Sequence, residues 1–222
     1  MDSASTADRV SEIAAELDRV KAGEAAEAKQ EAATQAFQRR GALLIAVLAV
    51  LLALNALGSA NAGSEQILNT IQAANTWAFY QAKNIRQTDY QLAADELEVI
   101  LPAVAAPVQA DVQAKIERYR ATVARYESEP DPNDPGNPLK GEGKRELTAQ
   151  ARNFEKQRDL ASRQGPHFDL ASSAFQIAIV LGSVAILITS GRLLALCVGL
   201  GALATLLMLN GFFLLAELPM IG

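Results

Sequence analysis

The sequence predicts an all-α membrane protein with three transmembrane helices and a long helical hairpin between the first and second spans. Two apolar regions predict the spans. Residues 41–58 contain one strongly polar side chain, Asn55, and the only charge between Asp169 and Glu217 is Arg192. Segments 41–58, 169–190 and 193–216 are each close to the roughly 20 residues that cross a hydrocarbon core. The hairpin is predicted because residues 59–168 are charged, helical in pattern and divided by prolines.

Composition excludes several functional classes. The net charge is −5, so no basic surface for nucleic acid is expected. Cys197 and His167 are the only cysteine and the only histidine. They cannot build an intramolecular disulfide or a cluster of Cys and His ligands around a metal. We therefore expect no cofactor, no metal site and no enzymatic activity.

The first segment, residues 1–40, is predicted to be a polar, alanine-rich helix. Its apolar residues Val10, Ile13, Leu17 and Val20 have the spacing of a coiled-coil seam, which Gly23 interrupts. Two heptads are too few to establish a coiled coil, so a solvated helix is the simpler interpretation.

The first span has one competing interpretation. Ala60-Asn61-Ala62 has the small-x-small form of a signal-peptidase cleavage site. The apolar run begins 40 residues into the chain, however, and continues directly into another helical pattern. We therefore favour a retained span over a cleaved leader.

The region between the spans is predicted to form three helical segments. Residues 64–101 lack proline and glycine, and Pro102 and Pro107 should end this helix. A second helix is expected over residues 108–128, and a third resumes near Leu139 and stops at Gly165-Pro166. The first two carry apolar residues at helical spacing: Ile67, Ile71, Ala74, Ala78, Ala82 and Ile85, then Val108, Val112, Ile116, Tyr119, Val123 and Tyr126.

Four prolines within residues 130–138 predict an exposed loop between the second and third helices. Because the chain must return to the membrane, the simplest arrangement joins these two helices as one returning arm of an upright hairpin. The alternative lays the helix over residues 67–85 flat on the bilayer, with Trp77, Phe79 and Tyr80 at the interface.

A short motif connects the chain to a known family. Residues Trp77–Lys83 read Trp-Ala-Phe-Tyr-Gln-Ala-Lys after the first span, and Phe175–Ala178 opens the second. With these residues the chain resembles a bacterial membrane family, domain of unknown function 4337, over roughly residues 41–215. The resemblance implies the three-span topology and implies no activity, cofactor or partner.

The motif also supplies the candidate interaction surface, which consists of Trp77, Tyr80, Gln81 and Lys83. Trp77, Tyr80 and Gln81 share a helix face, and we place Lys83 away from them. Tryptophan and tyrosine combine apolar area with a polar tip, which suits a partner or headgroup site. The alternative is that the aromatic residues pack against the returning arm near Phe154.

Polar residues inside the spans are Asn55, Ser183 and Asn210. Interhelical packing through hydrogen bonds is their expected role, together with close approach at Gly182, Gly191, Gly199 and Gly201. A transport path is the alternative. Mid-span carboxylates and lysines, which usually mark ion or proton relays, are absent from the sequence of the spans.

These observations lead to a functional expectation. We expect a non-enzymatic scaffold or interaction protein that binds the lipid bilayer through its spans and binds copies of itself or a protein partner through the hairpin. A small transporter or channel subunit is the alternative. Arg39, Arg40 and Arg192 predict a cytoplasmic amino terminus in a bacterial inner membrane, with the hairpin and carboxyl terminus outside the cytoplasm.

Overall fold

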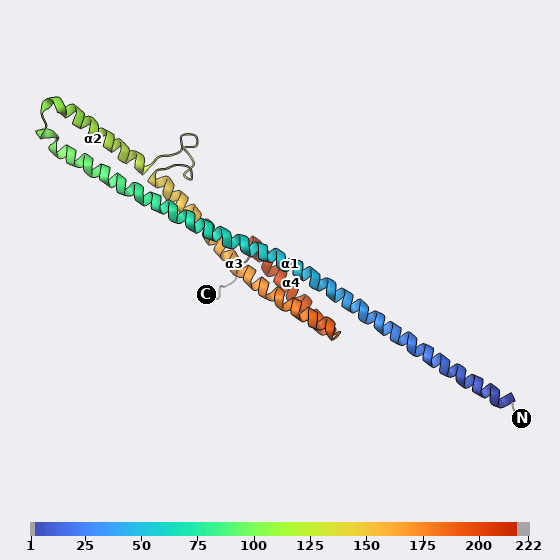
Figure 1. The fold of residues 1–222 in the computed structure, drawn as a ribbon. Helices are drawn as coiled ribbons and strands as arrows, with labels where there is room; N and C mark the ends of the chain where they lie inside the picture. Colours follow the sequence, from blue (N-terminus) through green and yellow to red (C-terminus); the bar gives the residue numbers. More distant parts are fainter. Residues whose placement is uncertain (1–2, 217–222) are drawn as a thin grey trace. The chain divides into compact units, whose positions relative to one another are not determined.

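A computed structural model describes residues 3–216 of the chain, which are almost entirely helical (Figure 1). The helices are α1 (Ser3–Ile100), α2 (Ala106–Glu127), α3 (Lys144–Leu187) and α4 (Gly191–Phe213), with a 3-10 turn η1 (Leu101–Ala103) between α1 and α2. The all-α prediction is confirmed for the described residues. The chain forms two compact units, residues 59–166 and the remainder. We call residues 59–166 the arm unit and the described residues on either side of it the span unit.

Helix α1 is continuous through the segments predicted as a polar helix, a span and a hairpin arm. The first proline of the sequence is Pro102, and α1 ends two residues before it, at Ile100. The isolated glycine Gly23 lies within the helix without ending it. Of the predicted amino-terminal seam, Leu17 is 50% exposed. The side chains of Val10, Ile13 and Val20 lie outside the described part of the structure.

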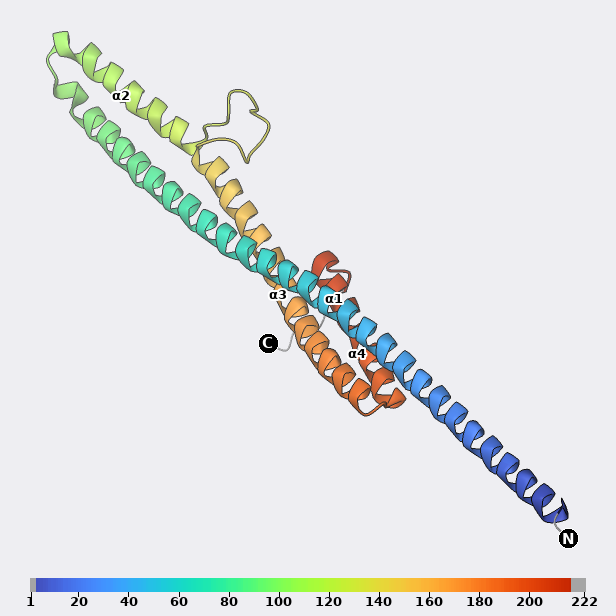
Figure 2. The ribbon, with the colours of Figure 1, turned by 45° about the vertical axis from the view of Figure 1, so that its right-hand side comes forward.

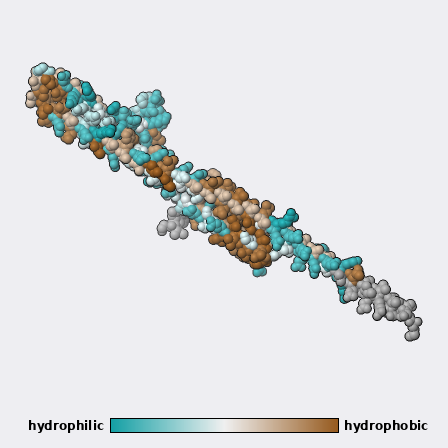
Figure 3. Space-filling view, in the orientation of Figure 1, coloured by the Kyte–Doolittle hydropathy of each residue, from teal (hydrophilic) through white to brown (hydrophobic). Residues whose placement is uncertain are grey.

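Within residues 3–216, three helices are long and apolar enough to cross a membrane: α1 within Lys21–Ala103, α3 and α4. Figure 3 shows apolar surface spread over this part of the molecule.

The span unit packs through small residues against larger ones. A Cβ built on Gly182 would lie 2.9 Å from Cys197 Sγ, and one built on Gly201 would lie 2.6 Å from Leu48 Cδ2. Both glycines therefore permit close helix approach, as predicted. Gly191 and Gly199, in contrast, face open space, so the same prediction is wrong for them.

In the arm unit, α2 lies beside α1 in both ribbon views (Figures 1 and 2). Tyr90 of α1 contacts Tyr119 and Tyr126 of α2, at ring-centroid distances of 5.3 Å and 6.0 Å. Ile116 is 1% exposed at the centre of the predicted apolar face of α2, whereas Val108 at its start is 47% exposed.

The predicted packing face of α1 in the arm unit is wrong. Ile67, Ile71 and Ile85 are 64%, 52% and 62% exposed. The buried side chains instead lie along a different side of the helix, and include Ala73, Lys83 and Ala94. The helix carries two stripes at heptad spacing, and hydrophobicity alone favoured the isoleucines. The inner stripe is formed by alanines and by polar side chains that find partners.

Helix α3 differs from prediction at both ends of its arm segment. It begins at Lys144 rather than near Leu139, and it continues through Gly165 and Pro166 to Leu187. A proline inside a helix removes one donor and costs about 3 kcal/mol. Residues on both sides of Pro166 are buried, among them Ala161 and Phe168, and their packing keeps α3 helical across the proline.

Candidate functional site

The motif residues of α1 lie at a polar junction inside the arm unit, where α1 meets the end of α2 and the beginning of α3. Trp77 is half-buried, and its Nε1 donates a hydrogen bond of 2.8 Å to Glu155 Oε1. Its ring meets that of Tyr80 edge to face at 5.6 Å. Trp77 therefore packs beside Glu155, the residue that follows Phe154, while the Tyr80 ring lies 5.6 Å from Lys144 Nζ, and only Gln81 of this group is exposed.

Lys83 is the most buried member of the motif, at 6% exposure. Its Nζ forms an ion pair of 3.0 Å with Glu129 Oε2, and lies 5.4 Å from the centroid of the Tyr126 ring. Lys83 and Tyr80 both contact residues beyond α1, Lys83 at Glu129 and Tyr80 at Lys144, whereas Gln81 is exposed. A buried charge is tolerated only when it is paired, and here the Glu129 carboxylate compensates the ammonium charge while the Tyr126 ring adds a cation–π attraction.

Gln87 and Lys144 extend the junction by one helical turn. Gln87 Nε2 donates to the Val123 carbonyl at 3.0 Å and to Glu127 Oε2 at 3.2 Å. Lys144 Nζ donates to Gln87 Oε1 at 2.8 Å and lies 3.3 Å from Glu127 Oε2. Gln87 Nε2 and Oε1 thus link the carboxyl end of α2 to the first residue of α3.

Glu146 anchors the connection between α2 and α3. Its carboxylate accepts hydrogen bonds from the Ser128 hydroxyl at 2.8 Å and from the Glu129 N–H at 3.1 Å. Burial is the largest single influence on the pKa of Glu146 and raises it, but the hydrogen bonds from Ser128 and Glu129, a backbone hydrogen bond of Glu146 itself and the nearby Arg145 together hold the pKa below its ordinary value. The carboxylate, in the first turn of α3, thus holds the residues that directly follow α2.

Two glycines, Gly141 and Gly143, allow residues 128–129 and residues 141–146 to pack closely together. A Cβ on Gly143 would overlap the Glu129 nitrogen and the Ser128 Cα, and a Cβ on Gly141 would lie 2.6 Å from Glu146 Cγ. The Glu142 N–H also donates to the Glu129 carbonyl at 2.9 Å. Residues 128–143 form a closed clasp, which is longer than the loop predicted over 130–138.

The tip of the clasp consists of successive tight turns. The N–H groups of Asp134, Asn137 and Lys140 each donate to the carbonyl three residues earlier, at 3.1 Å. Asp131 Oδ1 accepts from the Asn133 N–H at 2.8 Å, and Lys140 pairs with Asp134 at 2.9 Å. The loop therefore has its own hydrogen-bonded structure outside the junction.

Sequence reasoning missed most partners in this network: Gln87, Glu127, Glu129, Lys144 and Glu146. One usable signal was the spacing of Tyr80, Lys83 and Gln87, which places all three on one helix face. The acidic partners look like ordinary solvated charges in sequence. Within residues 3–216, no group of three or more Cys, His, Asp or Glu side chains is placed to hold a metal ion.

The polar residues predicted to pack within the spans have different surroundings. Asn55 is completely buried, and its Nδ2 donates to the Phe168 carbonyl at 2.9 Å and to Ser172 Oγ at 2.7 Å. Asn210 Nδ2 lies 3.1 Å from His167 Nδ1. Both asparagines join helices, whereas Ser183 is exposed and bonds only within its own helix, to the Ile179 carbonyl at 2.9 Å.

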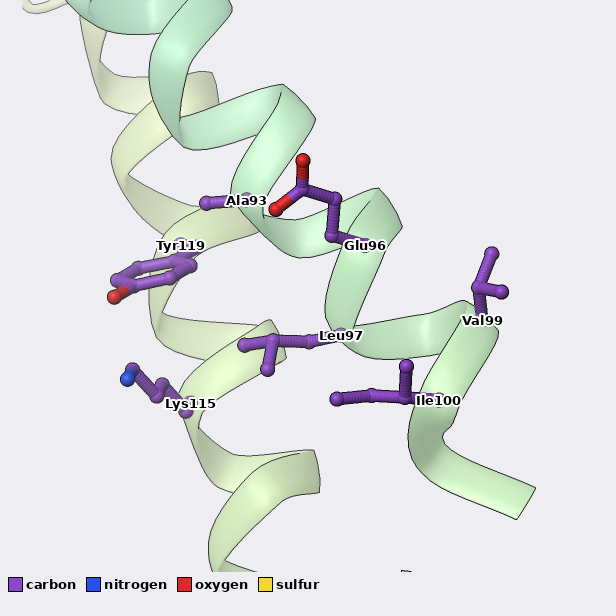
Figure 4. Close-up of a pocket in the computed structure, with 7 residues that line it drawn as sticks. All are labelled: Ala93, Glu96, Leu97, Val99, Ile100, Lys115 and Tyr119. Carbon is purple, nitrogen blue, oxygen red and sulfur yellow. The ribbon is translucent and has the colours of Figure 1, made fainter. Parts of the chain in front are cut away.

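A second feature of the arm unit lies where α1 turns into α2. A pocket of about 570 Å³ opens there between the helices (Figure 4). Leu97 and Ile100 point from α1 toward α2, on which Lys115 and Tyr119 also line the pocket, while Val99 points away. The sequence signal that was missed is the run 99–108, in which every side chain is apolar.

The described residues thus define an all-helical protein that combines three membrane-length apolar helices with an arm unit closed by a buried ionic junction. The model of the family described as a domain of unknown function (DUF4337) matches residues 37–214, and the chain belongs to that family. The family predicted from the sequence is confirmed. Comparison with curated proteins and with solved structures finds no match to the chain.

Proposed function

We propose that this protein is an integral membrane protein without catalytic activity, whose arm unit binds a protein partner. The spans support the first part. Large aliphatic side chains on the three apolar helices are more than half exposed, including Leu43, Val180 and Leu206 at 68%, 62% and 64%. Such surface is costly in water and matches a hydrocarbon core.

The arm unit has the composition of a water-exposed stalk. Its segment of α1 from residue 59 to 100 is about 63 Å long at about 1.5 Å rise per residue. Its helices are joined by an exposed ion pair between Arg120 and Glu98 and by a partly buried one between Lys83 and Glu129. We infer that the arm stands as a helical hairpin outside the bilayer, with residues 99–108 at its tip.

The observation that carries the proposal is the apolar tip. Val99, Ile100 and Val108 are 81%, 51% and 47% exposed, and Val99 and Ile100 also line the pocket between α1 and α2. Figure 3 shows apolar surface at this end of the arm unit. A contiguous exposed apolar patch beside a pocket is typical of an interaction site.

Charge around the tip indicates the kind of partner. Residues 87–114 contain five acidic side chains and no lysine or arginine: Asp89, Asp95, Glu96, Glu98 and Asp111. Lys115 lies at the pocket and Arg120 pairs with Glu98, but the four other carboxylates leave a net acidic rim, which disfavours an anionic lipid surface and complements basic residues. The proposed partner is therefore a protein segment with an apolar anchor flanked by lysine or arginine.

The buried motif residues have a structural role in this proposal. Trp77, Tyr80 and Lys83 hold the arm together, and Gln81 alone of the predicted interaction surface is available to a partner. The site of partner binding consequently moves from the motif to the tip.

A transporter or channel subunit is supported by one observation. Asn55 Oδ1 is buried among the spans with no hydrogen-bond partner in the described residues. Such an oxygen could contact a permeating species. The other polar groups nearby, His167 with Asn210 and Ser172 with Asn55, pair with one another.

Site-specific photocrosslinking tests the proposal. A benzophenone amino acid at Val99 of the full-length protein, in its native membranes, should yield an adduct with a different protein. The same probe at Ala121, an exposed residue of α2, is the matched control and should not. Equal adducts at both positions, or none at Val99, would contradict the proposal, as would solute flux through liposomes containing the protein.

A further inference from the structure

Helix α1 carries two stripes at alternating spacings of three and four residues along the arm unit. The inner stripe is buried or half-buried and consists of Asn69, Ala73, Thr76, Tyr80, Lys83, Gln87, Tyr90, Ala94 and Leu97. The outer stripe, which we call the outer seam, consists of Ser64, Ile67, Ile71, Ala74, Ala78, Gln81, Ile85, Thr88 and Leu92. Every residue of the outer seam is exposed.

The outer seam is more regular than scattered surface hydrophobicity. Single exposed apolar residues are normal on any protein. Here Ile67, Ile71, Ile85 and Leu92 are 64%, 52%, 62% and 58% exposed, and they share one heptad register. The register extends over residues 64–92, about four heptads, with isoleucine or leucine at four of its nine positions and alanine at two.

Charge identifies the kind of partner that suits this seam. Residues 66–82 contain no charged side chain, and Lys83 is directed into the arm unit. An identical surface would therefore meet no repulsion there. The same absence of lysine and arginine disfavours a lipid surface, because interfacial helices usually carry basic residues on their polar face.

The heptad register places branched side chains along the outer seam. Ile71 and Ile85 occupy a positions, and Ile67 occupies a d position. β-Branched side chains at a positions are typical of parallel coiled coils. Ala74 and Ala78 would allow the helices to approach closely between them.

We propose that a second copy of this chain docks on the outer seam, so that the arms pair as a parallel, in-register coiled coil. This inference deepens the proposed function and rests on its membrane anchorage, which gives two neighbouring copies the same direction. Residues on the seam would then meet their own counterparts across a two-fold axis. Asp95 would terminate the seam and leave the acidic tips free for the partner.

Disulfide cross-linking tests the paired arrangement in full-length protein with Cys197 replaced by alanine. Two matched variants each replace an exposed alanine by cysteine: Ala78→Cys on the seam and Ala121→Cys on α2. Disulfides require Cα atoms about 4.4–6.8 Å apart. In native membranes treated with a mild oxidant, Ala78→Cys should give several-fold more covalent homodimer than Ala121→Cys.

A second variant separates pairing from folding. Ile71→Lys places a charge on the exposed seam, so it should abolish the Ala78→Cys cross-link while the helical circular dichroism of the purified protein stays unchanged. Equal cross-linking at both alanines, or cross-linking that survives Ile71→Lys, would overturn the inference. If Ala78→Cys gives no homodimer while the probe at Val99 still gives an adduct, only the pairing through the outer seam is refuted. If the homodimer forms and the probe at Val99 gives no adduct, only the proposed function is refuted.

Discussion

Lys83 and Glu129 form an ion pair of 3.0 Å that ties the middle of the arm segment of α1 to the residue two positions beyond the end of α2. The exposed fractions of the two side chains are 8% and 32%. The pair is thus asymmetric: water can reach the carboxylate but hardly reaches the ammonium group.

This asymmetry predicts unequal effects of removing each partner. Glu129→Ala leaves a buried ammonium group unpaired and should destabilise the arm by about 3 kcal/mol. Lys83→Met keeps an unbranched chain against Phe79 and Tyr126 and leaves a carboxylate that water can solvate, so it should cost about 1 kcal/mol. Chemical unfolding of the full chain in detergent micelles, followed by circular dichroism, measures both. Equal losses would contradict the asymmetry.

Acid should weaken the clasp between α2 and α3. For Glu127, hydrogen bonds from Gln87 and then Lys144 lower the pKa below its ordinary value of 4.5, and the pKa of Glu146 is also lowered. A lowered pKa in the folded state stabilises the fold above pH 4.5, and this contribution is lost as the pH falls through the lowered pKa. The melting temperature should therefore decrease when the pH is lowered below about 4.5.

Glu146→Gln supplies the control for this pH dependence. The variant should melt lower at pH 7, and its melting temperature should change less between pH 5 and pH 3 than that of the natural protein. An identical acid dependence in both proteins would show that Glu146 does not contribute to it.

The glycines of the connection give a sharper test of its geometry. Gly143→Ala places a methyl group against the backbone of Ser128 and Glu129, so it should destabilise the arm by about 2 kcal/mol. Gly136→Ala, in the same loop, meets nothing within 4 Å and should stay within about 0.5 kcal/mol. Urea unfolding measured by circular dichroism compares the two. A neutral Gly143→Ala would show that the clasp is open in solution.

The fold was predictable where one physical effect dominates. Long uncharged runs predict the membrane-length helices, and Pro102 predicts the end of α1, since neither signal has a strong competitor. The inner face of α1 was not predictable, because Ile67 and Ile85 outweigh Ala73 and Ala94 on any hydrophobic scale. Two competing stripes on one helix cannot be ranked without knowing what the second stripe binds.

The candidate site was predictable only in part. Trp77 and Lys83 stand out as unusual residues on a long helix, but their acidic partners do not. Glu129 lies 46 residues from Lys83 in sequence, and a carboxylate on a charged helix has no local feature that indicates burial. Pro166 misled the prediction for a related reason, since tertiary packing on both sides keeps α3 helical.

The orientation predicted from a few charges can be tested directly. Arg39 and Arg40 precede the first predicted span and Arg192 lies between the last two, which predicts a cytoplasmic amino terminus and an arm outside the cytoplasm. In a cysteine-free background, Gly136→Cys in the exposed loop should react with a membrane-impermeant thiol reagent on intact cells, after outer-membrane permeabilisation if needed. Gln30→Cys should react only after lysis, and the opposite pattern would invert the topology.

Close packing around Phe168 should make one glycine of the span unit irreplaceable. A methyl group on Gly58 would lie 2.7 Å from the rings of both Phe168 and Phe212, which themselves meet edge to face at 4.9 Å. Two rings packed edge to face cannot yield easily, so Gly58→Ala should lower stability in detergent by about 2 kcal/mol. Gly63→Ala is the matched control on the same helix. It meets nothing within 4 Å, and the higher helix propensity of alanine should stabilise it by up to about 1 kcal/mol. Thermal unfolding of the two variants should therefore shift in opposite directions, and a shared direction would contradict the packing of Phe168 on Gly58.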